Sequence, residues 1–122
     1  MHARTLFEVA QQLCDKNGLT LKEKIEASTR EVFWVAESQN EFFYGNYAFG
    51  FILSKPGGPF VSMTDVLEFK DFIKSVTSTK GLFFTTGYFT RDVYQPLEGP
   101  KVSLYNRRKI LEEFKRLGLK WR

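Results

Sequence analysis

The sequence predicts an α/β fold in which a central mixed β-sheet is flanked by helices. Three observations lead to this prediction. Segments rich in β-branched and aromatic residues alternate along the chain with segments whose apolar residues recur at helical spacing. The length of 122 residues fits one compact domain, and 43% hydrophobic residues are enough for a sizeable core. No linker or repeat divides the chain, so we expect a single domain over residues 1–122.

The first half of the chain predicts one helix followed by three strands. Residues 5–16 carry apolar side chains at helical spacing, and Gly18 ends this helix. The strand predictions rest on alternating or β-rich segments at residues 19–27, 32–36 and 47–53. In the third strand, alternation places four large apolar side chains on one face: Tyr47, Phe49, Phe51 and Leu53. The turn sequence KPGGP then ends this strand.

The second half of the chain predicts three helices and two strands. In chain order they cover residues 64–76 (helix), 81–86 (strand), 90–94 (short helix), 102–104 (strand) and 106–117 (helix). Ser62 or Thr64 caps the first of these helices. The apolar sides of the two long helices are expected to be Val66, Leu67, Phe69, Ile73 and Val76, and Ile110, Leu111, Phe114 and Leu117. Strand 81–86 should lie beside strand 47–53, with helix 64–76 connecting them.

Residues 80–90 (KGLFFTTGYFT) are the most informative run in the chain. The run closely resembles a segment of Mrr-type restriction-endonuclease-like domains, which belong to the PD-(D/E)xK nuclease superfamily. Three further pieces resemble that family in the same order: LFEVA with Leu13 and Gly18, GPFVS with Asp65 to Phe69, and Leu104 to Leu111. The resemblance covers nearly the whole chain. It implies a restriction-endonuclease-like three-layer sandwich.

The resemblance also implies a nuclease centre. This chain lacks the family's residues at two positions of that centre. The family places an aspartate on the second strand and a Glu/Gln-x-Lys pair on the third. Lys55 falls at the lysine position, but Leu53 falls at the Glu/Gln position and Phe33 at the aspartate position. Carboxylates are needed to hold the divalent ion that activates water. We therefore expect no metal or other cofactor and a degenerate site, that is, a pseudoenzyme.

An active enzyme is the alternative. Glu31 lies two residues before Phe33 on the same strand face, and Glu8 matches a glutamate that some relatives use as an extra metal ligand. If Glu8, Glu31 and Lys55 converged, they could support a magnesium-dependent DNA endonuclease. Strand-edge glutamates are more often solvated, which favours the degenerate interpretation.

Positive charge is concentrated at the C-terminal end. The net charge is +4, yet residues 101–122 hold eight basic residues against Glu112 and Glu113. Such a segment can raise the affinity for DNA, and a solvated helix face is the alternative. The expected DNA-binding residues on the last helix are Arg107, Arg108, Lys109, Lys115 and Arg116. Binding should be weak and independent of DNA sequence.

Aromatic residues gather in the connection before the third strand. Core packing is the expected role for most of them. Part of the group could instead form an apolar surface for a protein partner or a second copy of the chain, through Phe42, Phe43 and Tyr44. A dimerisation or scaffold domain that touches no nucleic acid is therefore a further alternative.

Cysteine usage and hydropathy restrict the setting of the protein. The single cysteine, Cys14, cannot form an internal disulfide, so a reducing, cytoplasmic setting is expected. Catalysis by Cys14 is not expected, because the only histidine is His2 at the chain end. No apolar run approaches the roughly 18 residues needed to cross a bilayer, so no membrane partner is expected.

Overall fold

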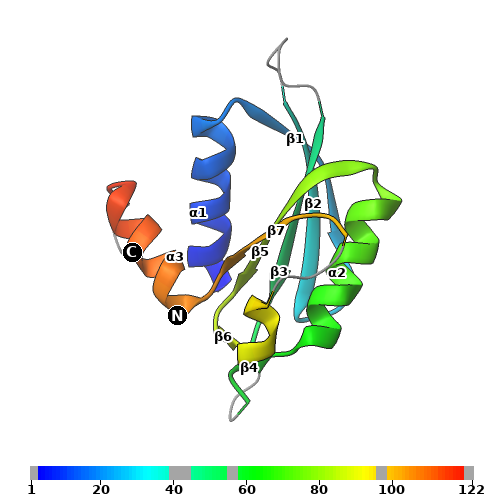
Figure 1. The fold of residues 1–122 in the computed structure, drawn as a ribbon. Helices are drawn as coiled ribbons and strands as arrows, with labels where there is room; N and C mark the ends of the chain where they lie inside the picture. The colour runs from blue at the N-terminus through cyan, green and yellow to red at the C-terminus, as the bar shows by residue number, and fades with distance from the viewer. Residues whose placement is uncertain (1–2, 39–44, 55–57, 96–98, 120–122) are drawn as a thin grey trace.

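The computed structural model describes residues 3–38, 45–54, 58–95 and 99–119, and it has a central sheet of five strands. Three α-helices and one 3₁₀ helix accompany the sheet (Figure 1). The helices are α1 (Ala3–Lys16), α2 (Met63–Ser75), η1 (Arg91–Tyr94) and α3 (Arg107–Arg116). The strands are β1 (Leu19–Glu26), β2 (Glu31–Ser38), β3 (Asn46–Ile52), β4 (Phe60–Val61), β5 (Ser78–Thr85), β6 (Tyr88–Phe89) and β7 (Val102–Tyr105).

The sheet is mixed, as the sequence predicts. Its strand order is β1-β2-β3-β5-β7, and β1, β2 and β3 form an antiparallel meander. Strands β3, β5 and β7 are parallel, and α2 connects β3 to β5. The predicted neighbourhood of residues 47–53 and 81–86 is therefore confirmed. Strands β4 and β6 form a separate small parallel sheet that the sequence did not reveal, because each has only two residues.

Helices cover both faces of the sheet, so the protein has three layers. In Figure 1, α1 and α3 lie on one side of the sheet and α2 lies on the other. One apolar cluster joins α1 and α3 to the sheet, and a second joins α2 to the opposite face. The alternation predicted for the third strand is confirmed: Tyr47, Phe49, Phe51 and Leu53 all belong to or pack against the α1-side cluster.

Helix α2 begins where the sequence predicts, with Ser62 as its N-cap. The backbone N–H of Ser62 donates a hydrogen bond to the Asp65 carboxylate (3.1 Å), which is part of a capping box. Helix α3 has Asn106 as its N-cap, and the Asn106 side chain accepts a hydrogen bond from the Lys109 N–H (3.0 Å).

Two residues that the sequence predicts to be buried in the core are exposed, so these predictions are wrong. Leu67 is 47% exposed and Leu111 is 38% exposed. Each follows directly after a fully buried residue, Val66 or Ile110, and one residue along an α-helix turns the side chain by about 100°. The buried face of each of the two helices is therefore narrower than the positions of the apolar residues in the sequence predict. The helix predicted at 90–94 is a 3₁₀ helix that starts after Thr90.

Candidate nucleic-acid interface

Three helix N-termini and three strand C-termini meet at one end of the molecule. Helix α2 follows β3 and α3 follows β7, so both helices begin near the carboxyl edge of the parallel strands. Helix α1 precedes β1, which runs parallel to β3, so α1 also begins at this end (Figure 1). Helix N-termini carry a partial positive charge, and crevices at carboxyl ends of strands commonly bind ligands in α/β proteins.

Leu53 is embedded at this end of the sheet and has an arginine as its neighbour. It packs against the α1-side apolar cluster. Its backbone N–H donates a hydrogen bond to the Arg30 carbonyl oxygen (2.8 Å), so Arg30 lies opposite Leu53 across the two strands. The Arg30 guanidinium in turn donates to the Leu53 carbonyl oxygen (2.5 Å). A leucine, with the Arg30 guanidinium bound to its carbonyl oxygen, thus occupies the position that the family resemblance assigns to Glu or Gln.

Phe33 lies on the opposite face of the sheet from Leu53. Its ring stacks on Phe72 and Phe69 of α2, at centroid distances of 4.5 and 6.0 Å. The interpretation that Phe33 and Leu53 replace two ligands of a single site is therefore wrong. On the Leu53 face, β2 presents Val32, which packs against the same cluster as Leu53.

Glu31 faces α2 as well, and Glu8 lies on α1 on the other side of the sheet. Burial, followed by the nearby carboxylates of Glu68 and Asp65, raises the pKa of Glu31, and Arg30 opposes this shift. The structure therefore does not bring Glu8 and Glu31 together, and Lys55 lies outside the described residues. Nowhere in the described ranges do three His, Cys, Asp or Glu side chains lie close enough together to hold a metal ion.

The five cationic residues predicted to bind DNA have different roles on α3. Arg107 is half-buried: its Nε donates to the Thr86 carbonyl oxygen (2.7 Å), and its backbone N–H donates to the Gly87 carbonyl oxygen (2.9 Å). The Arg107 guanidinium lies 5.9 Å from the Tyr88 ring centroid. Arg107 thus fastens the start of α3 to the loop after β5, so it is not a solvated surface charge.

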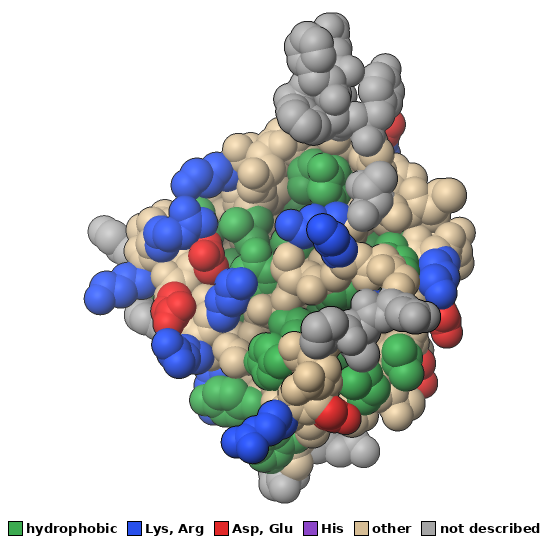
Figure 2. All heavy atoms as spheres, viewed as in Figure 1, with side chains coloured by type: hydrophobic (Ala, Val, Ile, Leu, Met, Phe, Trp, Pro, Cys, Tyr) green, Lys and Arg blue, Asp and Glu red, His purple; other side chains and the backbone are tan. Residues whose placement is uncertain are grey.

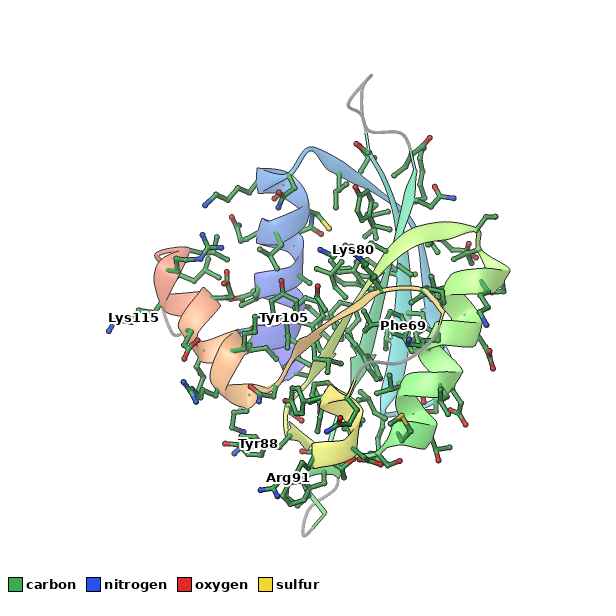
Figure 3. All side chains as sticks on the ribbon, viewed as in Figure 1. Phe69, Lys80, Tyr88, Arg91, Tyr105 and Lys115 are labelled. Carbon is green, nitrogen blue, oxygen red and sulfur yellow. The ribbon has the colours of Figure 1, made fainter. Side chains whose placement is uncertain are left out.

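The other four cations point outward. Arg108 pairs with Glu112 (3.1 Å), Arg116 pairs with Glu113, and Lys109 lies 4.5 Å from the Tyr105 ring centroid. Lys115 is exposed, and Figure 3 shows it pointing away from the molecule. Figure 2 shows basic side chains gathered over α3 with acidic ones among them. The Arg108–Glu112 pair is exposed on both sides, so it is weak and can rearrange when a phosphate approaches. Glu113 is only 18% exposed and accepts hydrogen bonds from two nitrogens of Arg116, so this pair is held more firmly.

Comparison with solved structures identifies the architecture. The DNA modification-dependent restriction endonuclease AspBHI superposes on 96% of this chain with a TM-score of 0.59, at 17% sequence identity. The fold is restriction-endonuclease-like. This chain spans 32% of the length of AspBHI. No model of a known protein family and no curated protein sequence matches the chain.

The restriction-endonuclease-like fold here carries exposed aromatic rings that sequence reasoning missed. Phe60 and Tyr88 come from the small β4–β6 sheet and are 64% and 38% exposed, with ring centroids 6.4 Å apart. Tyr94 of η1 is 54% exposed. The available signal was an aromatic residue directly after a glycine-containing turn, as in Gly87-Tyr88. Figure 3 shows Tyr88 beside Arg91 at the end where the strands finish.

Two further sequence predictions concern residues away from this interface. Cys14 is fully buried, and burial, with a smaller contribution from Asp15, raises the pKa of its thiol to about 11. The thiol is therefore neutral at physiological pH and has a packing role in the core. The predicted partner residues Phe42, Phe43 and Tyr44 lie outside the described residues. In the described ranges, no helix is long and apolar enough to cross a membrane.

Proposed function

We propose that this chain is an Mrr-type restriction-endonuclease-like domain that binds duplex DNA through α3 and whose nuclease centre is degenerate. The observation that carries the proposal is the arrangement of α3 within this fold. Ile110 and Phe114 anchor the helix in the core, at 0% and 4% exposure. Arg108, Lys115 and Arg116 are exposed on its outer side. Because the core holds α3 in place, the cations on its outer side can contact phosphates of a duplex.

The Mrr assignment rests on the sequence pieces and on where they lie. Residues 80–90 span the end of β5, the following turn and β6, next to the start of α3. The piece GPFVS leads into β4 and the N-cap of α2 at the same end. The segments that resemble the family therefore surround the end of the sheet where the nuclease centre of such a domain is expected.

The degenerate nuclease centre follows from the chemistry of the side chains at that end. Magnesium binds oxygen ligands, and cleavage of a phosphodiester requires carboxylates that hold the ion against the phosphate. Leu53 offers no ligand, and the Arg30 guanidinium beside it repels a cation. Because Glu8 and Glu31 lie on opposite faces of the sheet, the alternative of an active enzyme built from them is not favoured.

We predict that the purified protein does not cleave plasmid DNA with magnesium or manganese, as judged by loss of supercoiled plasmid on an agarose gel. Glu31→Gln and Lys55→Ala variants should behave like the wild type in this assay. Metal-dependent nicking that either variant abolishes would contradict the degenerate centre and favour the endonuclease.

We predict that the triple variant Arg108→Gln, Lys115→Gln and Arg116→Gln loses duplex binding in a gel shift at low salt. Three lost phosphate contacts should weaken binding by two orders of magnitude or more, at roughly fivefold or more for each contact. Arg107 is left unchanged because it holds the Thr86 carbonyl oxygen. Thermal unfolding of the variant should match the wild type.

A matched control removes the same charge elsewhere. Lys16, Lys22 and Lys24 are exposed on α1 and β1, away from the outer side of α3. Their joint replacement by Gln should leave most of the duplex affinity intact. An equal loss in both triple variants would show that only net charge matters, which would contradict a binding surface on α3.

A further inference from the structure

A lysine-lined hollow of about 550 Å³ runs along the outer edge of β7. Strand β7 is the last strand of the sheet, and the hollow extends from α2 past β7 to α3 and η1. Four lysines line it: Lys70, Lys80, Lys101 and Lys109. Among the described residues that line it there is no Asp or Glu. Lys70 is buried, so the charges that a ligand can reach are those of the exposed Lys80, Lys101 and Lys109. Three exposed positive charges favour a ligand that carries several negative charges.

Two of these lysines are held side by side by the sheet. Gly81 pairs with Val102 in parallel register, and the Gly81 N–H donates a hydrogen bond to the Lys101 carbonyl oxygen (3.0 Å). Lys80 and Lys101 therefore precede paired residues on neighbouring strands, and both are exposed. Figure 3 shows Lys80 near the middle of the face that β7 crosses. The paired strands keep the two lysines close together, and their flexible side chains allow both ammonium groups to reach one anion.

An exposed aromatic ring lines the same hollow. Tyr94 is 54% exposed, and its hydroxyl accepts a hydrogen bond from the Asn106 amide (3.3 Å). Phe89 contacts Tyr94 edge-on, with ring centroids 6.2 Å apart at 87°. The ring is thus held in a defined orientation with more than half of its surface in solvent. A nucleobase can stack on such a ring at low entropy cost.

The hollow continues towards the exposed aromatics of the small sheet. A smaller depression of about 270 Å³ shares Tyr94, Leu104 and Lys109 with it and adds Asn106, Arg108 and Glu112. Beyond it, Tyr88 lies under Arg107 and next to Phe60. The two hollows therefore share an exposed ring, Tyr94, and a cation, Lys109.

We infer that this hollow, named here the β7-edge groove, binds a single-stranded nucleic-acid segment, with phosphates on the lysines and a base on Tyr94. A lysine-lined groove with an aromatic platform is the combination that proteins use for single strands. A duplex keeps its bases stacked inside, so it cannot place one on Tyr94. The inference goes beyond the proposed duplex contact on α3 and can hold whether or not duplex binding is found.

The test compares a fluorescently labelled oligothymidine of about 12 nucleotides with a duplex of the same length, using anisotropy at several salt concentrations. The variant Lys80→Gln with Lys101→Gln should weaken single-strand binding about tenfold or more. Its slope of log affinity against log salt should be smaller by about 1.4, since each contact to a single strand contributes about 0.7. Duplex binding should change less than about twofold.

Tyrosine variants test the stacking. Tyr94→Leu should weaken single-strand binding about fivefold or more, whereas Tyr94→Phe, which keeps the ring, should bind nearly as well as the wild type. Equal loss in both variants would contradict base stacking. The variant Lys16→Gln with Lys24→Gln is the matched charge control, and a loss equal to that of the groove variant would overturn the inference.

Comparison of duplex, single-strand and nucleotide binding in the same variants distinguishes the remaining possibilities. Loss of duplex binding in the α3 triple variant with retained single-strand binding would support two separate surfaces. Absence of duplex binding alone would reject the proposed function and leave the β7-edge groove standing. If a nucleoside triphosphate bound in a manner that depends on Lys80 and Lys101 while the oligothymidine did not bind, the groove would be a nucleotide site and the inference would be wrong. Unchanged single-strand binding in the variant Lys80→Gln with Lys101→Gln would also overturn the inference. The role of these lysines would then be to protect an exposed strand edge from pairing with another chain.

Discussion

Replacement of Phe51 by Ala is expected to destabilise the protein by about 3–5 kcal/mol, which is a large share of the about 5–15 kcal/mol that stabilises a typical domain. Phe51 is 1% exposed in the middle of the sheet. Its ring lies 4.6 Å from Trp34, 4.9 Å from Phe7 and 5.2 Å from Phe84. These three rings belong to β2, β5 and α1, so they cannot close the cavity by the movement of one side chain. Chemical denaturation monitored by circular dichroism measures the loss.

Phe60→Ala is the matched control for Phe51→Ala. It removes the same atoms from a side chain that is 64% exposed, so the free energy of unfolding should change by no more than about 0.5 kcal/mol. If Phe51→Ala cost as little as Phe60→Ala, the aromatic cluster on the α1 face would not be the main core of the protein.

Gly87→Ala is expected to destabilise the protein by about 3 kcal/mol, because the new methyl group meets backbone. A Cβ at this position would lie 2.0 Å from the Pro59 carbonyl oxygen. That oxygen accepts a hydrogen bond from the Tyr88 N–H (2.7 Å), and the Gly87 carbonyl oxygen accepts from the Arg107 N–H. Relief of the clash must therefore separate β4 from β6 or shift the start of α3. Denaturant titration gives the stability.

Gly18→Ala separates this clash from the ordinary cost of replacing glycine. Gly18 has a φ of +67°, and a Cβ there would meet nothing within 4 Å. Its replacement should cost only about 1 kcal/mol of left-handed backbone strain. A cost for Gly87→Ala no larger than that for Gly18→Ala would contradict the close approach of the two backbone segments.

Much of the fold follows from local patterns in the sequence. The alternation of Tyr47, Phe49, Phe51 and Leu53 predicts one face of β3 correctly, because a strand repeats every two residues regardless of its neighbours. Ser62 and Asn106 mark the starts of α2 and α3, because N-caps act over three residues. The AspBHI superposition agrees with the three-layer sandwich that the family resemblance implies.

The site was harder to predict because it depends on pairing between strands. Whether Phe33 faces the same side as Leu53 is decided by the register of β2 against β3, in which Phe33 pairs with Gly50. A shift of one residue would turn Phe33 to the other face, and neither strand's own sequence specifies that register. Motif spacing therefore placed Phe33 and Leu53 in one site, although they lie on opposite sides of the sheet.

The role of Arg107 also depends on distant segments. In the sequence it is one of three consecutive basic residues at a helix start. In the structure its Nε donates to the Thr86 carbonyl oxygen, 21 residues earlier in the chain. The groove lysines come from α2, β5, the segment before β7, and α3, so no sequence window contains them together. Such a cluster becomes visible only once the sheet edge is built.

The salt dependence of duplex DNA binding by the wild-type protein tests the central proposal most directly. Contacts from Arg108, Lys115 and Arg116 predict a slope of log affinity against log salt of about −3, at about −0.9 for each phosphate contact. The slope should be the same for duplexes of unrelated sequence, since phosphate contacts carry no sequence information. Absence of duplex binding at the lowest salt, or a slope that the α3 triple variant leaves unchanged, would contradict a DNA-binding surface on α3.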